Sequence, residues 1–471
     1  MADVDQAADA AVAAAASFEA MGRAGRAGLL DDVAEALEAE RESLVDVADR
    51  ETRLGGTRLN GELTRTCFQL RLFGDILREG SYVDAVIDHA ADTPMGPRPD
   101  LRRMLVPVGP VAVFGASNFP LAFSVPGGDT ASALAAGCPV VVKAHPSHPE
   151  TSRRAFEAMR AVLPDGVLGL VEGYEAGAEL VNHRAIKAVG FTGSTAGGRA
   201  LFDLAASRPD PIPFFGELGS LNPLIVTAGA AAERADEIAD GYVGSMTLGN
   251  GQFCTKPGLL FAPVGSEGLR SALADAVSKI SAGPMLNGSI RDAYQAEVTR
   301  RRNDARLTLV AAAEPGPADL GAPALFAVAA ADLAGELLEE CFGPSALLVE
   351  YRDLDELLSA LGRLGGQLTA SVHAVDGEHE EIGRLHEELR LIAGRLIFGG
   401  YPTGVAVAWA MHHGGPFPAT TNSGHTSVGA TAVRRWLRPI CYQNAPHAVL
   451  PEELRDGNPA RIPRRVDGVL G

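Results

Sequence analysis

Lysine is scarce in this chain of 471 residues. It occurs only at Lys143, Lys187, Lys256 and Lys279, and arginine supplies the rest of the 41 basic side chains. The 59 acidic residues outnumber the basic ones, so the formal net charge is −18. Nucleic acids and anionic membranes both select clustered positive charge, and the composition therefore argues against either as a partner. A lysine that follows a buried strand becomes a candidate for a specific role.

Cysteine and long apolar runs are also lacking. The five cysteines are odd in number and contain no C-x-x-C pair, which argues against a disulfide framework or a zinc site. No run reaches the ~18–20 apolar residues that span a bilayer, and the acidic N-terminus does not resemble a signal peptide. These absences predict a cytoplasmic protein with reduced thiols. Four cysteines are expected to be small buried apolar residues: Cys67, Cys138, Cys341 and Cys441.

The length predicts two or three domains, since it exceeds what one core usually covers. Apolar positions three to four apart between about residues 7 and 53 predict amphipathic helices that pack on a sheet. Val-rich runs at 108–114 and 139–143, separated by a helical stretch at 129–136, are typical of a parallel sheet buried on both faces. A second β-α-β unit should begin at 223–226, with a helix near 231–248. The chain is therefore predicted to have an α/β fold.

Cys254 has a different setting from the other cysteines. It stands between Gly251 and Gly258, which permit close approach of the backbone to a ligand, and it precedes the Lys256-Pro257 turn. An accessible thiolate is a nucleophile, whereas a lone cysteine is more often core filler. From the local sequence alone, both interpretations stay open.

Three further positions carry polar groups that chemistry could use. Glu217 lies between Gly216 and Leu218 beside apolar residues, where a carboxylate is either hydrogen-bonded to backbone or functional. Asn118 follows a buried strand, where a plain turn residue is the simpler interpretation. Ser194 follows the next strand run at the start of a helix, whose N–H groups can bind a phosphate. The histidine pairs 145/148 and 412/413 are poorly spaced for shared ligation, so no metal site is expected.

In order along the chain, Asn118, Lys143, Glu217, Cys254 and the segment Glu340-Cys341-Phe342-Gly343-Pro344 resemble the aldehyde dehydrogenase superfamily. The likeness runs from roughly residue 102 to 443. It is greatest to the 2-oxoglutarate semialdehyde dehydrogenases and the NADP-dependent fatty aldehyde dehydrogenases grouped with them. The segments that carry this finer likeness are 114–124, 143–146, 251–258 and 413–420.

The resemblance implies a three-part build. Residues 1–81 and 105–222 would form a Rossmann-like cofactor-binding domain, and residues 223–424 an α/β catalytic domain. Residues 82–104 and 425–445 would be oligomerisation strands that join subunits into a homo-oligomer, dimer or tetramer. Trp436, Leu437, Ile440 and Tyr442 would otherwise be an exposed apolar patch.

The resemblance also implies a role for each site residue. Cys254 would attack the aldehyde, and the Asn118 amide with the Cys254 N–H would hold the oxyanion. Glu217, with a pKa raised by partial burial, would activate the water that hydrolyses the thioester. The family's cofactor contacts would fall on Lys143, Ser147, Gly193, Ser194, Glu340 and Phe342.

The implied reaction is NAD(P)-dependent oxidation of an aldehyde to a carboxylic acid, with 2-oxoglutarate semialdehyde favoured as substrate. A fatty or medium-chain aldehyde is the alternative substrate, and a non-catalytic binding or structural protein is the alternative of another class. Coenzyme A acylation is disfavoured, because that branch generally lacks the glutamate at position 217. NADP is expected to be preferred over NAD, because Pro146 stands where the family often has a carboxylate, and His145, Ser147 or Arg184 could add donors to the 2′-phosphate.

Overall fold

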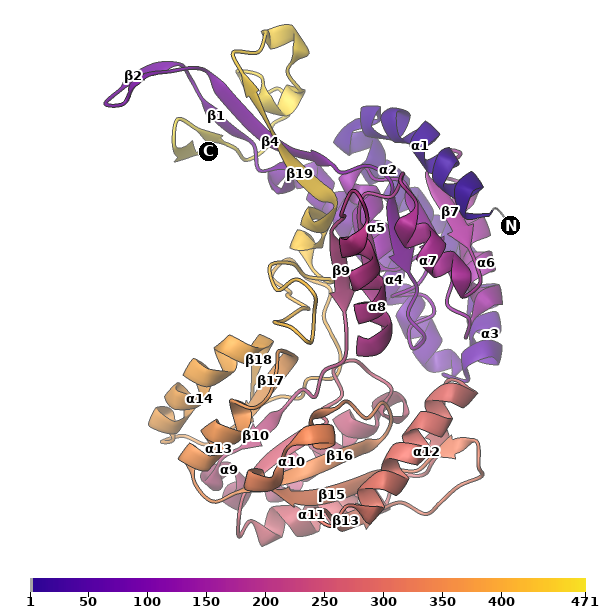
Figure 1. Ribbon diagram of the computed structural model, residues 1–471, viewed down its shortest axis with the longest axis vertical. Helices are drawn as coiled ribbons and strands as arrows, with labels where there is room; N and C mark the ends of the chain where they lie inside the picture. The colour runs from indigo at the N-terminus through magenta and orange to yellow at the C-terminus, as the bar shows by residue number, and fades with distance from the viewer. Residues whose placement is uncertain (1–2) are drawn as a thin grey trace.

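The N-terminal quarter of the chain is helical. In the computed structural model, which describes residues 3–471, four helices precede the first strand and pack over one parallel sheet (Figure 1). Buried Leu30, Leu37, Leu63 and Phe73 recur at helical spacing and form one core with the strands of that sheet. The helices are α1 (Val4–Ala20), α2 (Gly22–Ala39), α3 (Arg41–Thr52) and α4 (Gly56–Glu79).

A five-stranded parallel sheet with the order β7-β6-β5-β8-β9 forms the upper α/β layer. Its strands are nearly all buried, as the Val-rich runs predict. Ligands of such sheets bind at the carboxyl ends of the strands. The elements are β5 (Val111–Phe114), α5 (Gly128–Ala136), β6 (Val140–Lys143), α6 (Pro149–Arg160), β7 (Leu168–Val171), α7 (Glu175–Asn182), β8 (Val189–Thr192), α8 (Thr195–Ser207) and β9 (Phe214–Glu217).

A seven-stranded sheet with the order β13-β15-β16-β11-β10-β17-β18 forms the second layer, and all of its pairs are parallel except β13 with β15. The strands are β10 (Leu224–Val226), β11 (Leu259–Pro263), β13 (Thr308–Ala312), β15 (Ala324–Ala329), β16 (Ser345–Tyr351), β17 (Gln367–His373) and β18 (Ala393–Phe398). A short pair, β12 (Gly283–Pro284) with β14 (Leu320–Gly321), lies beside it. The helices are α9 (Ala228–Glu233), α10 (Ala235–Thr247), α11 (Glu267–Ser278), α12 (Gly288–Asn303), α13 (Leu354–Leu361) and α14 (His379–Ile392). The single helix expected near 231–248 is thus two, divided at Arg234.

A third sheet projects from the body of the molecule (Figure 1). It has the order β19-β4-β1-β20-β21 and joins residues far apart in the sequence: β1 (Val86–Asp88), β4 (Leu101–Pro107), β19 (Leu437–Gln443), β20 (Arg465–Val466) and β21 (Val469–Leu470). The hairpin β2 (Ala91–Thr93) with β3 (Gly96–Arg98) extends it. The last two strands, after residue 445, were not anticipated from the sequence.

Two expectations for this region are wrong. Trp436 is fully buried, because its ring packs edge-on against Phe215 and its Nε1 donates to the Ser132 hydroxyl, so it is not part of an exposed patch. Cys441 is exposed, because it lies on the edge strand β19, whereas Cys67, Cys138 and Cys341 are buried as expected. Within residues 3–471, no helix combines the length and apolar character needed to cross a membrane.

Candidate active site

The loop that carries Cys254 is held in an unusual backbone conformation. Gly249, Asn250 and Gly251 all have positive φ angles, and a Cβ on Gly251 would lie 2.3 Å from the backbone of Gly343. Glycine is needed at position 251, because any side chain there would collide with the loop that contains Gly343. Asn222 Nδ2 donates to the Cys254 carbonyl at 2.8 Å, and this hydrogen bond holds the turn in place.

His413 and Glu217 converge on the Cys254 thiol. His413 Nε2 lies 3.5 Å from Cys254 Sγ and 3.0 Å from Glu217 Oε1, while the Ser427 hydroxyl donates to Glu217 Oε2 at 2.6 Å. The loop that carries His413 is tied to the end of β9, where Leu218 N donates to the Ala419 carbonyl at 2.8 Å. Two bases therefore stand beside one thiol.

The ionisation of this group differs from the sequence-based expectation in one respect. Burial raises the pKa of Glu217, but the electrostatic interaction with His413 and hydrogen bonds from His413 and Ser427 outweigh it, so the pKa lies below its usual value rather than above it. Burial, with the nearby Glu217 and Glu340, raises the pKa of Cys254 well above that of an ordinary thiol. At neutral pH the carboxylate is charged and the thiol is protonated, so the thiol needs a base to become a nucleophile.

Asn118 reaches the same loop from the end of β5. Its side chain is 7% exposed, and Nδ2 donates to the Gln252 carbonyl at 3.0 Å. A carboxamide has two N–H groups, so one is still available for an oxyanion near Cys254. The Asn118 carbonyl in turn accepts from Arg58 Nη2 at 2.6 Å, which ties this loop to α4.

The expected cofactor residues lie at the carboxyl ends of the upper sheet. Lys143 ends β6 and is half-buried, and its ammonium group makes no hydrogen bond or ion pair within residues 3–471; burial lowers its pKa. The Ser147 hydroxyl instead accepts from Asn287 Nδ2 at 2.8 Å, which joins this region to the N-terminus of α12. Burial lowers the pKa of His145 to about 3, so this imidazole is neutral and is not a cationic phosphate donor.

Gly193 and Ser194 are exposed where β8 turns into α8. Ser194 caps this 13-residue helix by accepting from Gly197 N at 3.2 Å. The hydroxyl proton and the first backbone N–H groups of α8 still face outward, which suits a phosphate group.

Glu340 and Phe342 belong to the loop that contacts the nucleophile loop through Gly343. Burial raises the pKa of Glu340 to about 7, although Lys256 and the Ser220 N–H act in the opposite direction. Lys256 Nζ is buried and donates to the carbonyls of Cys341, Gly343 and Ser345 at 2.5, 3.2 and 2.8 Å. Phe342 is half-buried beside these residues. Lys256 is thus a structural clamp between the two loops.

The side chains of Glu217, Cys254 and His413 are close enough to one another to bind a metal ion. Ligand atoms of Glu217, Cys254 and His413 lie within 4.8 Å of one another. A thiol with a carboxylate and an imidazole is equally the set that nucleophilic catalysis requires. Their position beside Asn118 favours the catalytic interpretation.

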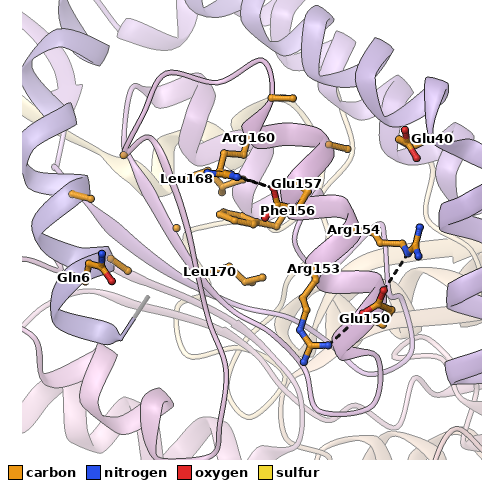
Figure 2. A pocket seen from close by; sticks show the side chains of 16 residues that line it. Gln6, Glu40, Glu150, Arg153, Arg154, Phe156, Glu157, Arg160, Leu168 and Leu170 are labelled. Atoms are coloured by element: carbon orange, nitrogen blue, oxygen red, sulfur yellow. Dashed lines mark hydrogen bonds and ion pairs between the residues drawn. The ribbon is translucent and has the colours of Figure 1, made fainter. Parts of the chain in front are cut away.

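A large surface groove lies elsewhere and contains none of these residues. It measures about 1030 Å³ and runs along β7 between α1 and α6. Figure 2 shows Phe156, Leu168 and Leu170 inside it, with Glu150 paired to Arg153 and Arg154 at the rim. It offers no nucleophile, so the site around Cys254 is the chemical centre.

Comparison with known proteins agrees with this arrangement. The pattern described as "Aldehyde dehydrogenase family" matches residues 1–415, a span that includes the thiol, both of its bases and Asn118. The chain belongs to the aldehyde dehydrogenase family. The dehydrogenase is therefore an enzyme that oxidises aldehydes, and members of this family use NAD or NADP.

Two curated relatives match almost the whole chain. Alpha-ketoglutaric semialdehyde dehydrogenase 2 of Azospirillum brasilense is 47% identical, and the alignment covers 99% of this chain and 91% of that protein. Alpha-ketoglutaric semialdehyde dehydrogenase of Acinetobacter baylyi is 44% identical with the same coverage. Among solved structures, 1-pyrroline-5-carboxylate dehydrogenase from Thermus with bound NAD has a TM-score of 0.81 at 21% identity, covering 93% of this chain and 85% of that one, which shows the fold.

One residue beside the thiol was not recognised from the sequence. His413 stands in a segment rich in Gly, Pro and His, a composition that signals a functional loop but no particular partner. Nothing in the local sequence connects His413 with Cys254. The missing information was the pairing of this loop with β9.

Proposed function

We propose that the dehydrogenase oxidises 2-oxoglutarate semialdehyde to 2-oxoglutarate, with NADP preferred over NAD. The observation that carries the reaction type is the thiol of Cys254 beside two bases, His413 and Glu217, and within reach of the Asn118 loop. A non-catalytic protein would have no use for all four groups. The substrate is supported by the two relatives that are named for this aldehyde.

The residues at the carboxyl ends of the upper sheet, together with Glu340 from the other layer, fit a dinucleotide. Ser194 and the α8 N-terminus would hold its phosphates, Lys143 its adenine ribose, and Glu340 its nicotinamide ribose. When bound, the nicotinamide supplies the oxidant that converts the hemithioacetal on Cys254 into a thioester.

In acylation, Cys254 Sγ forms a bond to the aldehyde carbon, and the thiol proton passes to His413 Nε2 as the proton already on that nitrogen moves to Glu217 Oε1. The carbonyl oxygen gains the negative charge, and the second N–H of the Asn118 amide stabilises it. A donor of this kind contributes roughly 10²–10³ in rate.

In deacylation, Glu217 removes a proton from the water that attacks the thioester carbon, and the C–S bond breaks to release the acid. Its low pKa keeps it ionised at neutral pH, so it is ready to accept that proton. This glutamate favours release of a free acid over transfer to coenzyme A.

The preference for NADP rests on the charges near Lys143. Position 146 is an exposed proline, and the acid that acts on Lys143 is Glu172, whose two oxygens are held by Arg153 at 2.9 Å each. Because Arg153 offsets the charge of Glu172, this carboxylate repels a 2′-phosphate less than an unpaired carboxylate would. Placing Glu at position 146 should therefore shift the ratio of kcat/KM toward NAD.

We also propose that the chain forms at least a homodimer through the projecting sheet. The thiol chemistry of Cys254 requires a reducing surrounding, which suits the cytoplasmic location expected from the sequence.

The test follows the absorbance of the reduced cofactor with 2-oxoglutarate semialdehyde and hexanal, with NAD and NADP, and with and without coenzyme A. We expect the highest kcat/KM for the semialdehyde with NADP and no dependence on coenzyme A. A kcat/KM for hexanal equal to or above that for the semialdehyde would replace the substrate by a fatty aldehyde. A kcat/KM for NAD more than about tenfold above that for NADP would refute the cofactor preference, since a tenfold ratio is 1.4 kcal/mol.

A further inference from the structure

Two arginines on one face of α4 stand over the loops of the active site. Arg58 and Arg65 are seven residues apart, two helical turns, and so share a face. The Arg58 guanidinium carbon lies 4.7 Å from the ring centre of Phe253, the neighbour of Cys254, and 5.0 Å from that of Phe119. The Arg65 guanidinium carbon lies 5.2 Å from the ring centre of Phe123.

The three rings form a continuous apolar wall that links Arg65 to the nucleophile loop. Phe119 packs edge-on against both Phe123 and Phe253, with ring centres 5.3 and 5.2 Å apart. Burial lowers the pKa of Arg65, and Glu62, Cys254 and Glu217 act against this shift, so the guanidinium is within electrostatic reach of the nucleophile and the base.

Arg65 lacks a partner of its own. Within residues 3–471 its side chain takes part in no hydrogen bond or ion pair, and its Nη1 atom is buried without a partner. Arg58 Nη1 and Arg395 Nε are also buried without a partner, but each of these side chains is anchored by other bonds: Arg58 donates to the Asn118 carbonyl, and Arg395, also near the thiol, donates to the carbonyls of Pro402 and Gly404. A buried N–H group left unpaired, on a guanidinium with no other bond, is costly, which is expected where a ligand supplies the missing acceptor.

Glu62 does not satisfy this charge. Its Oε1 accepts from Leu121 N at 2.8 Å and from Ala122 N at 2.9 Å, which positions the loop after Asn118, and its buried Oε2 has no hydrogen-bond partner, so neither oxygen is bonded to Arg65. One carboxylate faces two guanidinium groups, Arg58 and Arg65, and a net positive charge remains on this face. The rest of the site is acidic, through Glu217 and Glu340, and would repel an anionic substrate.

We propose that Arg65 binds the carboxylate of the substrate and makes the enzyme select short aldehydes with a remote carboxylate over uncharged ones. This inference rests on the proposed function, because it assigns the end of the substrate opposite the aldehyde. In 2-oxoglutarate semialdehyde three carbons separate the two groups, so one end can reach Cys254 while the other meets the planar fork of Arg65. A guanidinium binds a carboxylate through two parallel hydrogen bonds.

The experiment compares Arg65→Met, Arg65→Lys and, as a matched control on another face of α4, Arg71→Met, whose arginine is paired with Glu38 at the surface. The substrates are 2-oxoglutarate semialdehyde and uncharged pentanal at saturating NADP. Arg65→Met should lose about 100-fold in kcat/KM for the semialdehyde, mainly through KM, and Arg65→Lys about tenfold. Pentanal should change less than about threefold in both, and Arg71→Met should resemble the wild type.

A second readout does not depend on the substrate assignment. Inhibition of pentanal oxidation by 2-oxoglutarate should weaken in Arg65→Met by about the same factor as the semialdehyde KM rises. If the wild type prefers pentanal but 2-oxoglutarate inhibition still depends on Arg65, the proposed substrate fails and the anion site stands. Equal losses for both aldehydes would make Arg65 a structural residue, and unchanged inhibition would mean that the carboxylate binds elsewhere; either result overturns the inference.

Discussion

The thiol, the imidazole and the carboxylate at the active site differ in what they can do at neutral pH. Glu217 is ionised and held by Ser427 and His413, whereas Cys254 is protonated because burial and two nearby acids raise its pKa. His413 Nε2 lies within 3.5 Å of the sulfur and 3.0 Å of Glu217 Oε1, so His413 can relay the thiol proton to Glu217 in the first step. Glu217 acts again as the base in the hydrolytic step.

This proton relay predicts that His413→Gln slows acylation by about 10²–10³, within the usual range for loss of a general base. Stopped-flow measurement of the first turnover of NADPH formation reports that step. His412→Gln, at the adjacent half-buried position, is the matched control and should keep the wild-type rate. An unchanged first turnover in His413→Gln would assign the thiol proton to Glu217 alone.

A pH dependence of cofactor binding follows from Glu340. Its pKa is raised to about 7, so the side chain is protonated below that pH and loses its negative charge and acceptor strength for ribose hydroxyls. The dissociation constant of NADP should rise about tenfold from pH 8 to pH 6, as the ionised fraction falls. Fluorescence titration checks this, and Glu340→Gln should bind weakly with a flat profile. A flat profile in the wild type would remove Glu340 from the cofactor site.

At the residue scale, the resemblance to the aldehyde dehydrogenases, carried by the order of Asn118, Glu217 and Cys254 along the chain, predicted that they share one site, whereas the local patterns left the role of each residue open. His413 could not be placed that way. Its closeness to Cys254 depends on the Leu218–Ala419 hydrogen bond between segments about two hundred residues apart, and no local pattern encodes such a pairing. The same holds for Arg65, which looks like an ordinary surface arginine of an amphipathic helix.

Among the elements, the nucleophile loop is the one most dependent on backbone geometry. Gly251→Ala should destabilise the fold by about 1–3 kcal/mol, since φ is +68° there and the new Cβ would meet the Gly343 backbone. Activity should fall more steeply than stability, because Cys254 and Glu340 lie on the two loops that would separate. Gly244→Ala, in α10 with open space around it, is the control and should keep its Tm. Wild-type kcat in Gly251→Ala would show that the loop tolerates the shift.

The elements were predictable where the apolar pattern is local. The strands at Val111–Phe114 and Val140–Lys143 follow from Val-rich runs, and α5 follows from the alanine stretch between them. The break between α9 and α10 and the strands β20 and β21 were not predictable. The break at Arg234 lies inside a continuous helical pattern of apolar residues. The strands β20 and β21 have two residues each and form only because β20 pairs with β1 and β21 pairs with β20.

For the whole molecule, the projecting sheet predicts self-association. Its edge strand β19 presents unpaired backbone groups, and Met95, Val469 and Leu470 are 96%, 71% and 65% exposed on the extension. Exposed edges and apolar side chains of this kind are normally covered by a second subunit. Light scattering at micromolar concentration should give at least twice the chain mass of 49.0 kDa. A mass of one chain would contradict this.

The central claim is that aldehyde oxidation passes through a thioester on Cys254 that Glu217 helps to hydrolyse. Rapid mixing of Glu217→Gln with 2-oxoglutarate semialdehyde and NADP tests it most directly, with the NADPH burst followed by absorbance and the quenched protein analysed by peptide mass spectrometry. The account predicts a burst close to one NADPH per active site, then little turnover, with the acyl group on the Cys254 peptide and no burst in Cys254→Ala. Retained turnover in Cys254→Ala, or an acyl group on another residue, would contradict it.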